Sequence, residues 1–229
     1  MRLDQFVSQA TGLSRSQAQR LIRQGALTLQ GHILTNPSQH IEPNDPIELE
    51  QTVLTLPQPL YLMLNKPQGV VSATSDAQAT VLDLIDHPHK HTLHLVGRLD
   101  KDTTGLLLLT SEGAWSHRIT SPHKHIGKTY LVTVEQPLTA LALEQLQQGI
   151  QLQGEKRPTS PAQVVRLGDT QLRLTIYEGM YHQVKRMLTV VGNEVVALHR
   201  EKIGELELDA CLALGNWREL SYEERDLFK

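Results

Sequence analysis

Four consecutive leucines, Leu106 to Leu109, follow directly on a polar turn of sequence Arg-Leu-Asp-Lys-Asp-Thr-Thr-Gly at residues 98–105. So apolar a run, bounded by turn residues, is typical of a strand in the core of a sheet. The turn therefore enters rigid structure, and Asp100 within it is a carboxylate that the scaffold can hold in a fixed position. Asp, Thr and Gly are also ordinary turn residues, so the octet alone is equally consistent with a capped turn that has no chemical role.

Strands outnumber helices along the chain and do not alternate with them regularly, as a doubly wound sheet would require. Strand-like runs cover residues 61–64, 93–96, 106–110, 129–135, 162–166, 171–177 and 194–198, and helical patterns lie near 80–86, 112–119, 138–148 and 181–191. This order predicts an α+β fold with a large, mainly antiparallel mixed sheet. Pro57 and Pro59 mark a linker, because proline fits neither a strand ladder nor a helix interior. We therefore expect two domains, residues 1–57 and 61–229.

The N-terminal region predicts a small α/β module. A capping box of Ser14 and Gln17 begins a helix that Gly25 ends, and a Gln30-Gly31 turn between apolar residues predicts a hairpin. Three arginines, Arg15, Arg20 and Arg23, carry the polar side of the helix.

Composition restricts the cellular compartment and the class of protein. A single cysteine, Cys211, excludes an internal disulfide and a cysteine-based zinc site, so we expect a reducing compartment and a small buried thiol. No apolar stretch approaches 18 residues, which predicts a soluble, cytoplasmic protein. The net charge of −3 argues against a general nucleic-acid coat.

Two local patterns have both a functional and an ordinary interpretation. Residues 115–130 contain Arg118, Lys124 and Lys128 with no acidic residue, and such a strip either follows a phosphate backbone or is a solvated face. Four histidines look like metal ligands, but they lie in a proline-containing loop without a cysteine or a fixed carboxylate, so we expect no metal there; they are His87, His89, His91 and His94.

Residues 96–110, VGRLDKDTTGLLLLT, resemble the signature of the RNA pseudouridine synthases in the form found in the RsuA family. Two further blocks occur in the order of that family, LNKPQG at 64–69 and EGMYHQVKRM at 178–187, and the resemblance covers essentially the whole chain. Residues 1 to about 50 resemble the RNA-binding module first seen in ribosomal protein S four, which also occurs in synthetases.

This resemblance implies a reaction that needs no cofactor and no metal, in which uracil is detached, turned and rejoined to ribose through carbon five. It implies that Asp100 is the catalytic carboxylate, as nucleophile or as base, and that Asp102 is a supporting residue. An ionised carboxylate in a dry pocket needs a cation, which the family supplies at the position of Lys185; the alternative is that Lys185 only contacts phosphate. Tyr130 aligns with a tyrosine that packs on the target base and handles the carbon-five proton, although a strand tyrosine is more often a packing residue.

The same resemblance suggests how RNA would be held. The target uridine must leave its stack, and Arg98 is placed to fill the vacated space or to grip a neighbouring phosphate. Lys66 is expected to bind phosphate, beside a glycine, Gly69, that permits close approach. Met180 departs from the usual basic or polar residue of the third motif. The expected RNA-binding residues are Arg15, Arg20, Arg23, Lys66, Arg98, Arg118, Lys128 and Arg186.

The implied function is conversion of uridine to pseudouridine at position 516 of 16S rRNA, by a monomer that acts on 16S rRNA or a partly assembled small ribosomal subunit and not at a membrane. Residues 182–185, His-Gln-Val-Lys, favour the small-subunit type over members that modify 23S rRNA. The rival from another class is a non-catalytic RNA-binding or ribosome-assembly protein, which would predict loss of Asp100 or Tyr130; both are present.

Overall fold

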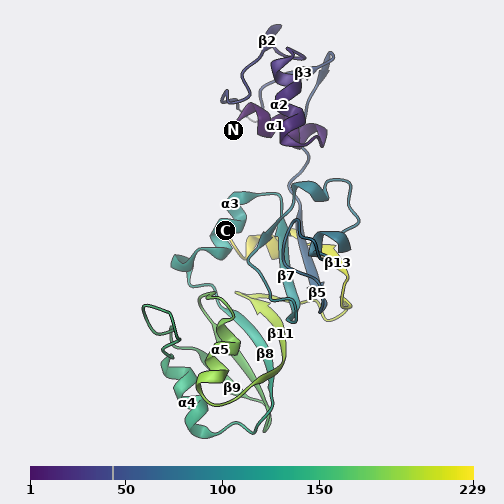
Figure 1. Ribbon diagram of the computed structural model, residues 1–229. Helices are drawn as coiled ribbons and strands as arrows, with labels where there is room; N and C mark the ends of the chain where they lie inside the picture. Colours follow the sequence, from purple (N-terminus) through teal and green to yellow (C-terminus); the bar gives the residue numbers. More distant parts are fainter. Residues whose placement is uncertain (43) are drawn as a thin grey trace. The chain divides into compact units, whose positions relative to one another are not determined.

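The structure, a computed structural model, describes residues 1–42 and 44–229 and consists of two compact units (Figure 1). One unit comprises residues 1–59 with 87–92, and the other comprises residues 60–86 with 93–229. Among the described residues, no helix combines the length and the apolar character needed to cross a membrane.

The first unit contains two helices and a four-stranded sheet of order β2-β1-β3-β4. The helices are α1 (Leu3–Thr11) and α2 (Arg15–Arg23), and the strands are β1 (Leu27–Leu29), β2 (His32–Leu34), β3 (Ile47–Leu49) and β4 (Thr52–Val53). The predicted capping box is present, because the Ser14 side chain accepts from the Gln17 amide. The predicted hairpin is also present: Gln30 and Gly31 have φ of 50° and 80°, as a type I′ turn requires.

Asp4 joins the two helices of this unit. Its fully buried carboxylate accepts hydrogen bonds from Arg2 (2.9 Å), Arg15 (3.2 Å) and Gln19 (2.8 Å). The bond from Arg2, reinforced by Arg15 and Gln19, lowers the pKa of Asp4 well below its usual range in spite of burial. Arg15 therefore has a structural partner within the unit.

The second unit is built on a nine-stranded sheet of order β13-β5-β7-β11-β8-β10-β9, with β6 paired to β7 and β12 paired to β11. Its pairings are antiparallel except for that of β7 with β11, which confirms the predicted mainly antiparallel α+β fold. The strands are β5 (Tyr61–Lys66), β6 (His94–Val96), β7 (Thr104–Thr110), β8 (Lys128–Val134), β9 (Gln163–Arg166), β10 (Gln171–Ile176), β11 (Val195–Ile203), β12 (Leu206–Glu207) and β13 (Trp217–Glu219). The helices are α3 (Gly113–Thr120), α4 (Ala140–Gln148), α5 (Gln183–Val190) and α6 (Tyr222–Asp226), and there are 3-10 turns at Val81–Leu84 and Pro122–Lys124. A further 3-10 turn, Lys90–Thr92, belongs to the first unit.

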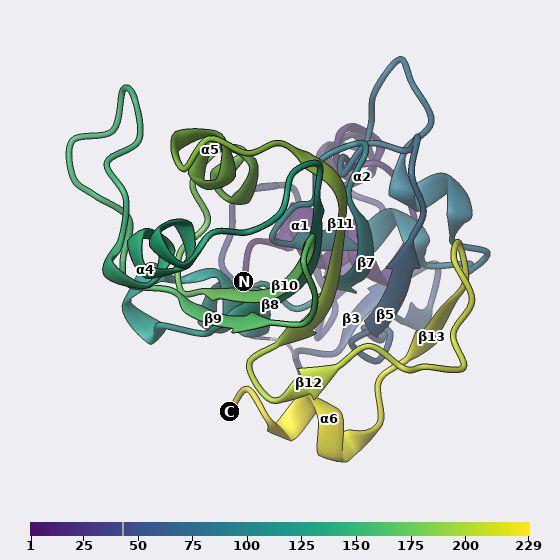
Figure 2. The same ribbon diagram turned by 90° about the horizontal axis from the view of Figure 1, so that it is seen from below.

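Apolar clusters pack on both faces of the part of the sheet around β7. Helices α4 and α5 lie along one side of β8, β9 and β10 (Figure 2), and their buried side chains join a cluster that includes Leu107 and Leu109. Helix α3 and the C-terminal segment join a second cluster that includes Leu106 and Leu108. The four leucines of β7 thus alternate between two cores, as expected for a fully buried strand.

Gly105, at the start of β7, is required by a close approach of two strands. It has φ of 103°, and a Cβ built on it would lie 2.3 Å from the carbonyl oxygen of Arg200 in β11. Gly105 and Arg200 are register partners in the parallel pairing of β7 with β11. This glycine lets the strand that follows the polar turn enter the centre of the sheet.

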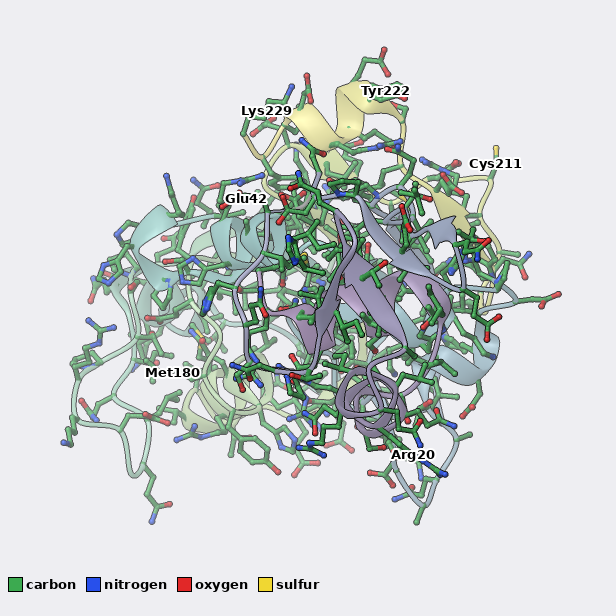
Figure 3. All side chains as sticks on the ribbon, turned by 90° about the horizontal axis from the view of Figure 1, so that it is seen from above. Arg20, Glu42, Met180, Cys211, Tyr222 and Lys229 are labelled. Atoms are coloured by element: carbon green, nitrogen blue, oxygen red, sulfur yellow. The ribbon has the colours of Figure 1, made fainter. Side chains whose placement is uncertain are left out.

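The expectation of a buried Cys211 is wrong: the thiol is exposed and projects from the surface (Figure 3). Cys211 lies in a turn after β12, where its amide donates to the Asp209 carboxylate at 2.9 Å. The apolar residues around it belong to a connection to β13 and not to an element with one buried face.

Candidate active site

The polar turn before β7 is held by a buried lysine at the end of β5. The Lys66 side chain is fully buried, and its ammonium donates to the carbonyl oxygens of Thr103 (2.9 Å), Asp100 (3.0 Å) and Pro67 (3.1 Å). Burial, which outweighs the nearby carboxylates of Asp102 and Asp100, lowers the pKa of Lys66 to about 8. The expectation that Lys66 binds phosphate is therefore wrong, because the chain itself encloses and satisfies the ammonium.

Two further contacts fix the same turn. The Ser72 hydroxyl donates to the Leu99 carbonyl oxygen (2.6 Å) and accepts from the Leu99 amide (3.1 Å). The Gly69 amide donates to the Lys101 carbonyl oxygen at 2.9 Å, and Gly69 has φ of 90° with nothing within 4 Å of a built Cβ. The need for glycine at position 69 thus comes from its backbone conformation. The LNKPQG block is the support of the turn that carries Asp100.

Lys185, in the first turn of α5, reaches both carboxylates of the turn. Its ammonium lies 3.1 Å from Asp100 Oδ2 and 2.5 Å from Asp102 Oδ1. Burial alone would lower the pKa of Lys185, but the hydrogen bonds to Asp102 and Asp100 outweigh it and raise this pKa above its ordinary value. The hydrogen bond from Lys185 also lowers the pKa of Asp102. The contact between Lys185 and Asp100 is the one that the family resemblance implies, whereas the shorter contact with Asp102 could not be expected from it.

A cavity of about 710 Å³ opens beside Asp100 and brings together five of the predicted site residues: Arg98, Asp100, Lys128, Tyr130 and Lys185. Tyr130 is 8% exposed, so only the part of its ring that faces this cavity is accessible. Lys128 and Tyr130 are two positions apart on β8 and share a face of the strand. Arg98 is exposed at the cavity wall, next to the turn.

Arg200 adds a buried positive charge to the cavity wall. Its Nε donates to the Leu106 carbonyl oxygen at 2.7 Å, and its guanidinium carbon lies 6.0 Å from the centre of the Tyr130 ring. One terminal nitrogen, Nη2, is buried without a hydrogen-bond partner among the described residues. Burial, and then the charge of Arg200, lowers the pKa of Lys128. The interior of the cavity is thus suited to negatively charged groups of a ligand.

Two of the predicted RNA-binding arginines have hydrogen-bond partners within the protein. Arg186 donates to Glu155 (2.9 Å), to the Gln153 carbonyl oxygen (2.6 Å) and to the Tyr181 carbonyl oxygen (3.0 Å), and thereby ties two loops to α5. Arg118, on α3, donates through Nε to the Phe228 carbonyl oxygen at 3.0 Å and is not among the residues that line the cavity. Both guanidinium groups have partners within the second unit, and their contact with RNA stays a prediction.

Sequence reasoning missed two residues of this site. His182 Nε2 lies 3.5 Å from Asp100 Oδ1, and His182 has φ of 47°, a conformation that is uncommon outside glycine and often found at functional sites. Arg200 is buried beside Tyr130 on the neighbouring strand. An arginine that follows the apolar residues of β11 was the available signal for Arg200. The sequence has no comparable signal for the backbone conformation of His182.

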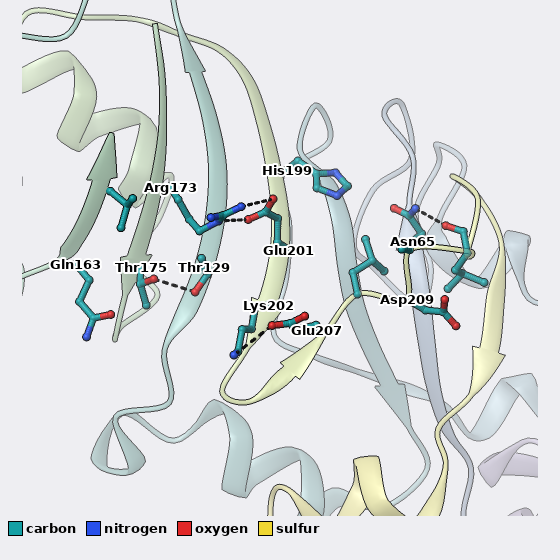
Figure 4. A pocket seen from close by; sticks show the side chains of 14 residues that line it. Asn65, Thr129, Gln163, Arg173, Thr175, His199, Glu201, Lys202, Glu207 and Asp209 are labelled. Carbon is teal, nitrogen blue, oxygen red and sulfur yellow. Dashed lines mark hydrogen bonds and ion pairs between the residues drawn. The ribbon is translucent and has the colours of Figure 1, made fainter. Parts of the chain in front are cut away.

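A second cavity, of about 680 Å³, lies on the opposite face of β8, β10 and β11, because the side chains that line it alternate with those of the first cavity (Figure 4). Its charged groups are paired with one another, as in Arg173–Glu201 (2.6 Å) and Lys202–Glu207 (3.5 Å). Lys128 and Arg200 of the first cavity have no ion pair among the described residues, which makes this cavity the better candidate for the active site. No cluster of three or more potential metal ligands occurs among the described residues.

The mixed sheet and the lysine-held carboxylate in a basic cavity define an enzyme that acts on nucleic acid. A family model described as RNA pseudouridylate synthase matches residues 60–189, and the model of the S4 domain matches residues 1–47. The chain therefore belongs to the RNA pseudouridine synthase family and carries an N-terminal S4 domain.

Several relatives cover nearly the whole chain. The chain is 50% identical over 226 residues to "Ribosomal small subunit pseudouridine synthase A" of Pasteurella multocida, covering 98% of this chain and 97% of the relative. It is equally identical to the protein of that name from Escherichia coli, with 98% of each chain covered. A solved structure titled "Crystal structure of pseudouridylate synthase" superposes with a TM-score of 0.75 at 47% identity and covers 100% of both chains.

Proposed function

We propose that this enzyme converts uridine to pseudouridine in the RNA of the small ribosomal subunit, at position 516 of 16S rRNA. The observation that carries the proposal is the Asp100 carboxylate, held 3.1 Å from the Lys185 ammonium at the edge of a cavity whose wall contains Tyr130. Relatives that are 50% identical over nearly the full length carry the name of a small-subunit enzyme. The small subunit, or its 16S rRNA, is thus the partner, and the enzyme acts in the cytoplasm.

The reaction is an isomerisation. The bond between ribose C1′ and uracil N1 breaks, the base turns, and a new bond forms between C1′ and C5. The proton on C5 leaves, and N1 gains one, so atoms and charges balance without an external reactant. The protein must therefore supply a carboxylate at the ribose, a group that moves the C5 proton, and an enclosed space for the detached base.

The cavity supplies these three functions. Lys185 lies 3.1 Å from Asp100 Oδ2, where its ammonium orients the carboxylate and partly compensates its charge at the edge of the cavity. Tyr130 presents its ring to the base and its hydroxyl to the C5 proton. Arg98, exposed at the cavity wall, fills the space that the extruded uridine vacates.

The polar contacts with RNA are divided between the two domains, which we place at residues 1–57 and 61–229. In the catalytic domain, Lys128 lines the cavity and is the side chain that we assign to a phosphate. In the S4 domain, Arg20 and Arg23 are exposed near the end of α2, where they also complement the helix dipole. We propose that the enzyme acts as a monomer.

Mapping pseudouridine in rRNA tests this function directly. In a strain from which the gene is deleted, carbodiimide treatment and primer extension should show the loss of a single stop, at position 516 of 16S rRNA. The wild-type gene should restore that stop, and a gene with Asp100→Asn should not. Loss of a stop in 23S rRNA instead would contradict the small-subunit assignment.

A further inference from the structure

Tyr181 places a large aromatic side chain in solvent at the edge of the active-site cavity. Its side chain is 76% exposed and belongs to the lining of the cavity that contains Asp100. The preceding residue, Met180, packs against the core instead. An exposed aromatic ring beside a catalytic cavity offers a contact surface that the reaction steps described above do not use.

The Tyr181 ring lies on the ring of His182. The two ring centres are 3.8 Å apart with an angle of 18° between the planes, so the rings are stacked. The His182 ring in turn reaches the catalytic carboxylate, with Nε2 3.5 Å from Asp100 Oδ1. A single ring, that of His182, therefore separates Tyr181 from Asp100, and the large exposed area of Tyr181 leaves room for a further ring.

The segment that carries the two rings is fixed before any ligand binds. The Met180 amide donates to Gln183 Oε1 at 3.0 Å, and Gln183 Nε2 donates to Glu178 at 2.9 Å. On the other side, Arg186 donates to the Tyr181 carbonyl oxygen at 3.0 Å. A rigid exposed aromatic ring provides contact area at a low cost in conformational entropy.

We propose that Tyr181 is the stacking platform for an unpaired RNA base that neighbours the target uridine. The inference rests on the proposed function and adds a determinant of how the RNA is held. A uridine that leaves its stack exposes the faces of the adjacent bases, and proteins that recognise unpaired RNA commonly stack such bases on tyrosine. Lys128, which lines the same cavity and has no ion pair among the described residues, suits the backbone of the same strand.

Three variants test the contribution of the ring. Tyr181→Ala should weaken binding of a 16S rRNA fragment about 5-fold to 150-fold, the usual loss for one stacked base, and should lower kcat/KM in parallel. Tyr181→Phe should bind as the wild type does, because it keeps the ring. Tyr222→Ala is the matched control: this tyrosine is also 76% exposed, but it lies on α6 against Arg225 and does not line the cavity.

An RNA that lacks one base identifies the partner of the ring. Fragments with an abasic site on the 5′ or the 3′ side of the target uridine are compared with the intact fragment, for the wild type and for Tyr181→Ala. At one of the two positions, base removal should weaken binding to the wild type and have little further effect on Tyr181→Ala. Equal losses in both proteins at both positions, or an unchanged affinity of Tyr181→Ala for the intact fragment, would overturn the inference. Pseudouridine formation by the wild type on the intact fragment tests the proposed function separately.

Discussion

The Lys66 ammonium lies 3.0 Å from the main-chain oxygen of Asp100, although the two residues are 34 positions apart. A second lysine, Lys185, holds the side chain of the same aspartate at 3.1 Å. One lysine thus fixes the backbone of the turn and the other fixes the carboxylate. The carboxylate is held in position before RNA arrives, as a preorganised site requires.

Lys66→Met tests the first of these roles. The change keeps the length of the side chain but leaves several buried carbonyl oxygens without a donor, at a cost of about 1–3 kcal/mol each. We expect a lower melting temperature and a strongly reduced kcat, with unchanged RNA affinity and an unchanged salt dependence of binding. Lys101→Met is the matched control, because Lys101 lies in the same turn but is exposed. Its ammonium bonds only the Gln78 side chain (2.6 Å) among the described residues. If Lys66→Met has normal stability but its RNA binding depends less on salt than that of the wild type, Lys66 contacts phosphate.

The pH dependence of kcat follows from the pKa of Lys66, which burial lowers to about 8. As the pH rises through this value, the Lys66 ammonium loses a proton that it donates to a carbonyl oxygen of the turn. The turn then lacks one of its hydrogen bonds, so single-turnover kcat should fall. The free energy of unfolding should change in the opposite direction: the folded state binds fewer protons than the unfolded state between about pH 8 and pH 10.4, so the free energy of unfolding should rise with pH across this window, as the cost of burying the charged ammonium is removed. Lys66→Met should lack both changes. An alkaline fall confined to KM would point to Lys128 instead.

The arginines of α2 should separate into two kinds. Arg20 and Arg23 are exposed, with no ion pair among the described residues, whereas Arg15 bonds the buried Asp4 at 3.2 Å. Replacement of Arg20 and Arg23 by alanine should reduce the slope of log affinity against log salt by roughly 1.4, about 0.7 for each lost phosphate contact. Arg15→Ala should lower the stability of the S4 domain with a smaller effect on that slope. An unchanged slope for the double variant, measured by filter binding, would remove both arginines from the RNA interface.

The sequence allowed the main strands to be predicted because their periodicity is strong. The long strands of the sheet and the helices α3, α4 and α5 lie close to the ranges expected from apolar runs. The short elements β12, β13 and α6 were not expected, because segments of two to five residues have too few side chains to show a period. The predicted strand ended at 198, because charged residues follow. Strand β11 nevertheless continues to Ile203, and some of these charged residues lie on the face that lines the second cavity.

The sequence motifs predicted which residues lie together, although their roles stay predictions, and they did not predict which charged residues are enclosed by the protein. Asp100, Tyr130 and Lys185 were expected to meet, and the cavity brings them together. Lys66 and Arg186 were expected to contact phosphate, because lysine and arginine usually lie at the surface. Their enclosure by carbonyl oxygens and by Glu155 depends on contacts between segments far apart in the chain. A residue's charge in the sequence does not show whether its partner is RNA or the protein itself.

The two carboxylates of the turn should differ in function although both contact Lys185. Asp102 is 69% exposed and Asp100 is 28% exposed, so Asp102 can be neutralised with less effect on the cavity. Asp102→Asn should slow the enzyme and leave turnover measurable. Lys185→Ala should resemble loss of Asp100 more than loss of a phosphate contact, because it removes the cation from the catalytic carboxylate.

Tritium release from RNA labelled at carbon five of uridine, measured for Asp100→Asn, tests the central claim most directly. Asparagine keeps the size of the side chain and removes the charge that the reaction needs. We expect no detectable release under single-turnover conditions, with RNA affinity close to that of the wild type. Release by Asp100→Asn at a rate comparable to that of Asp102→Asn would contradict the assignment of Asp100 as the catalytic carboxylate, and with it the proposed mechanism.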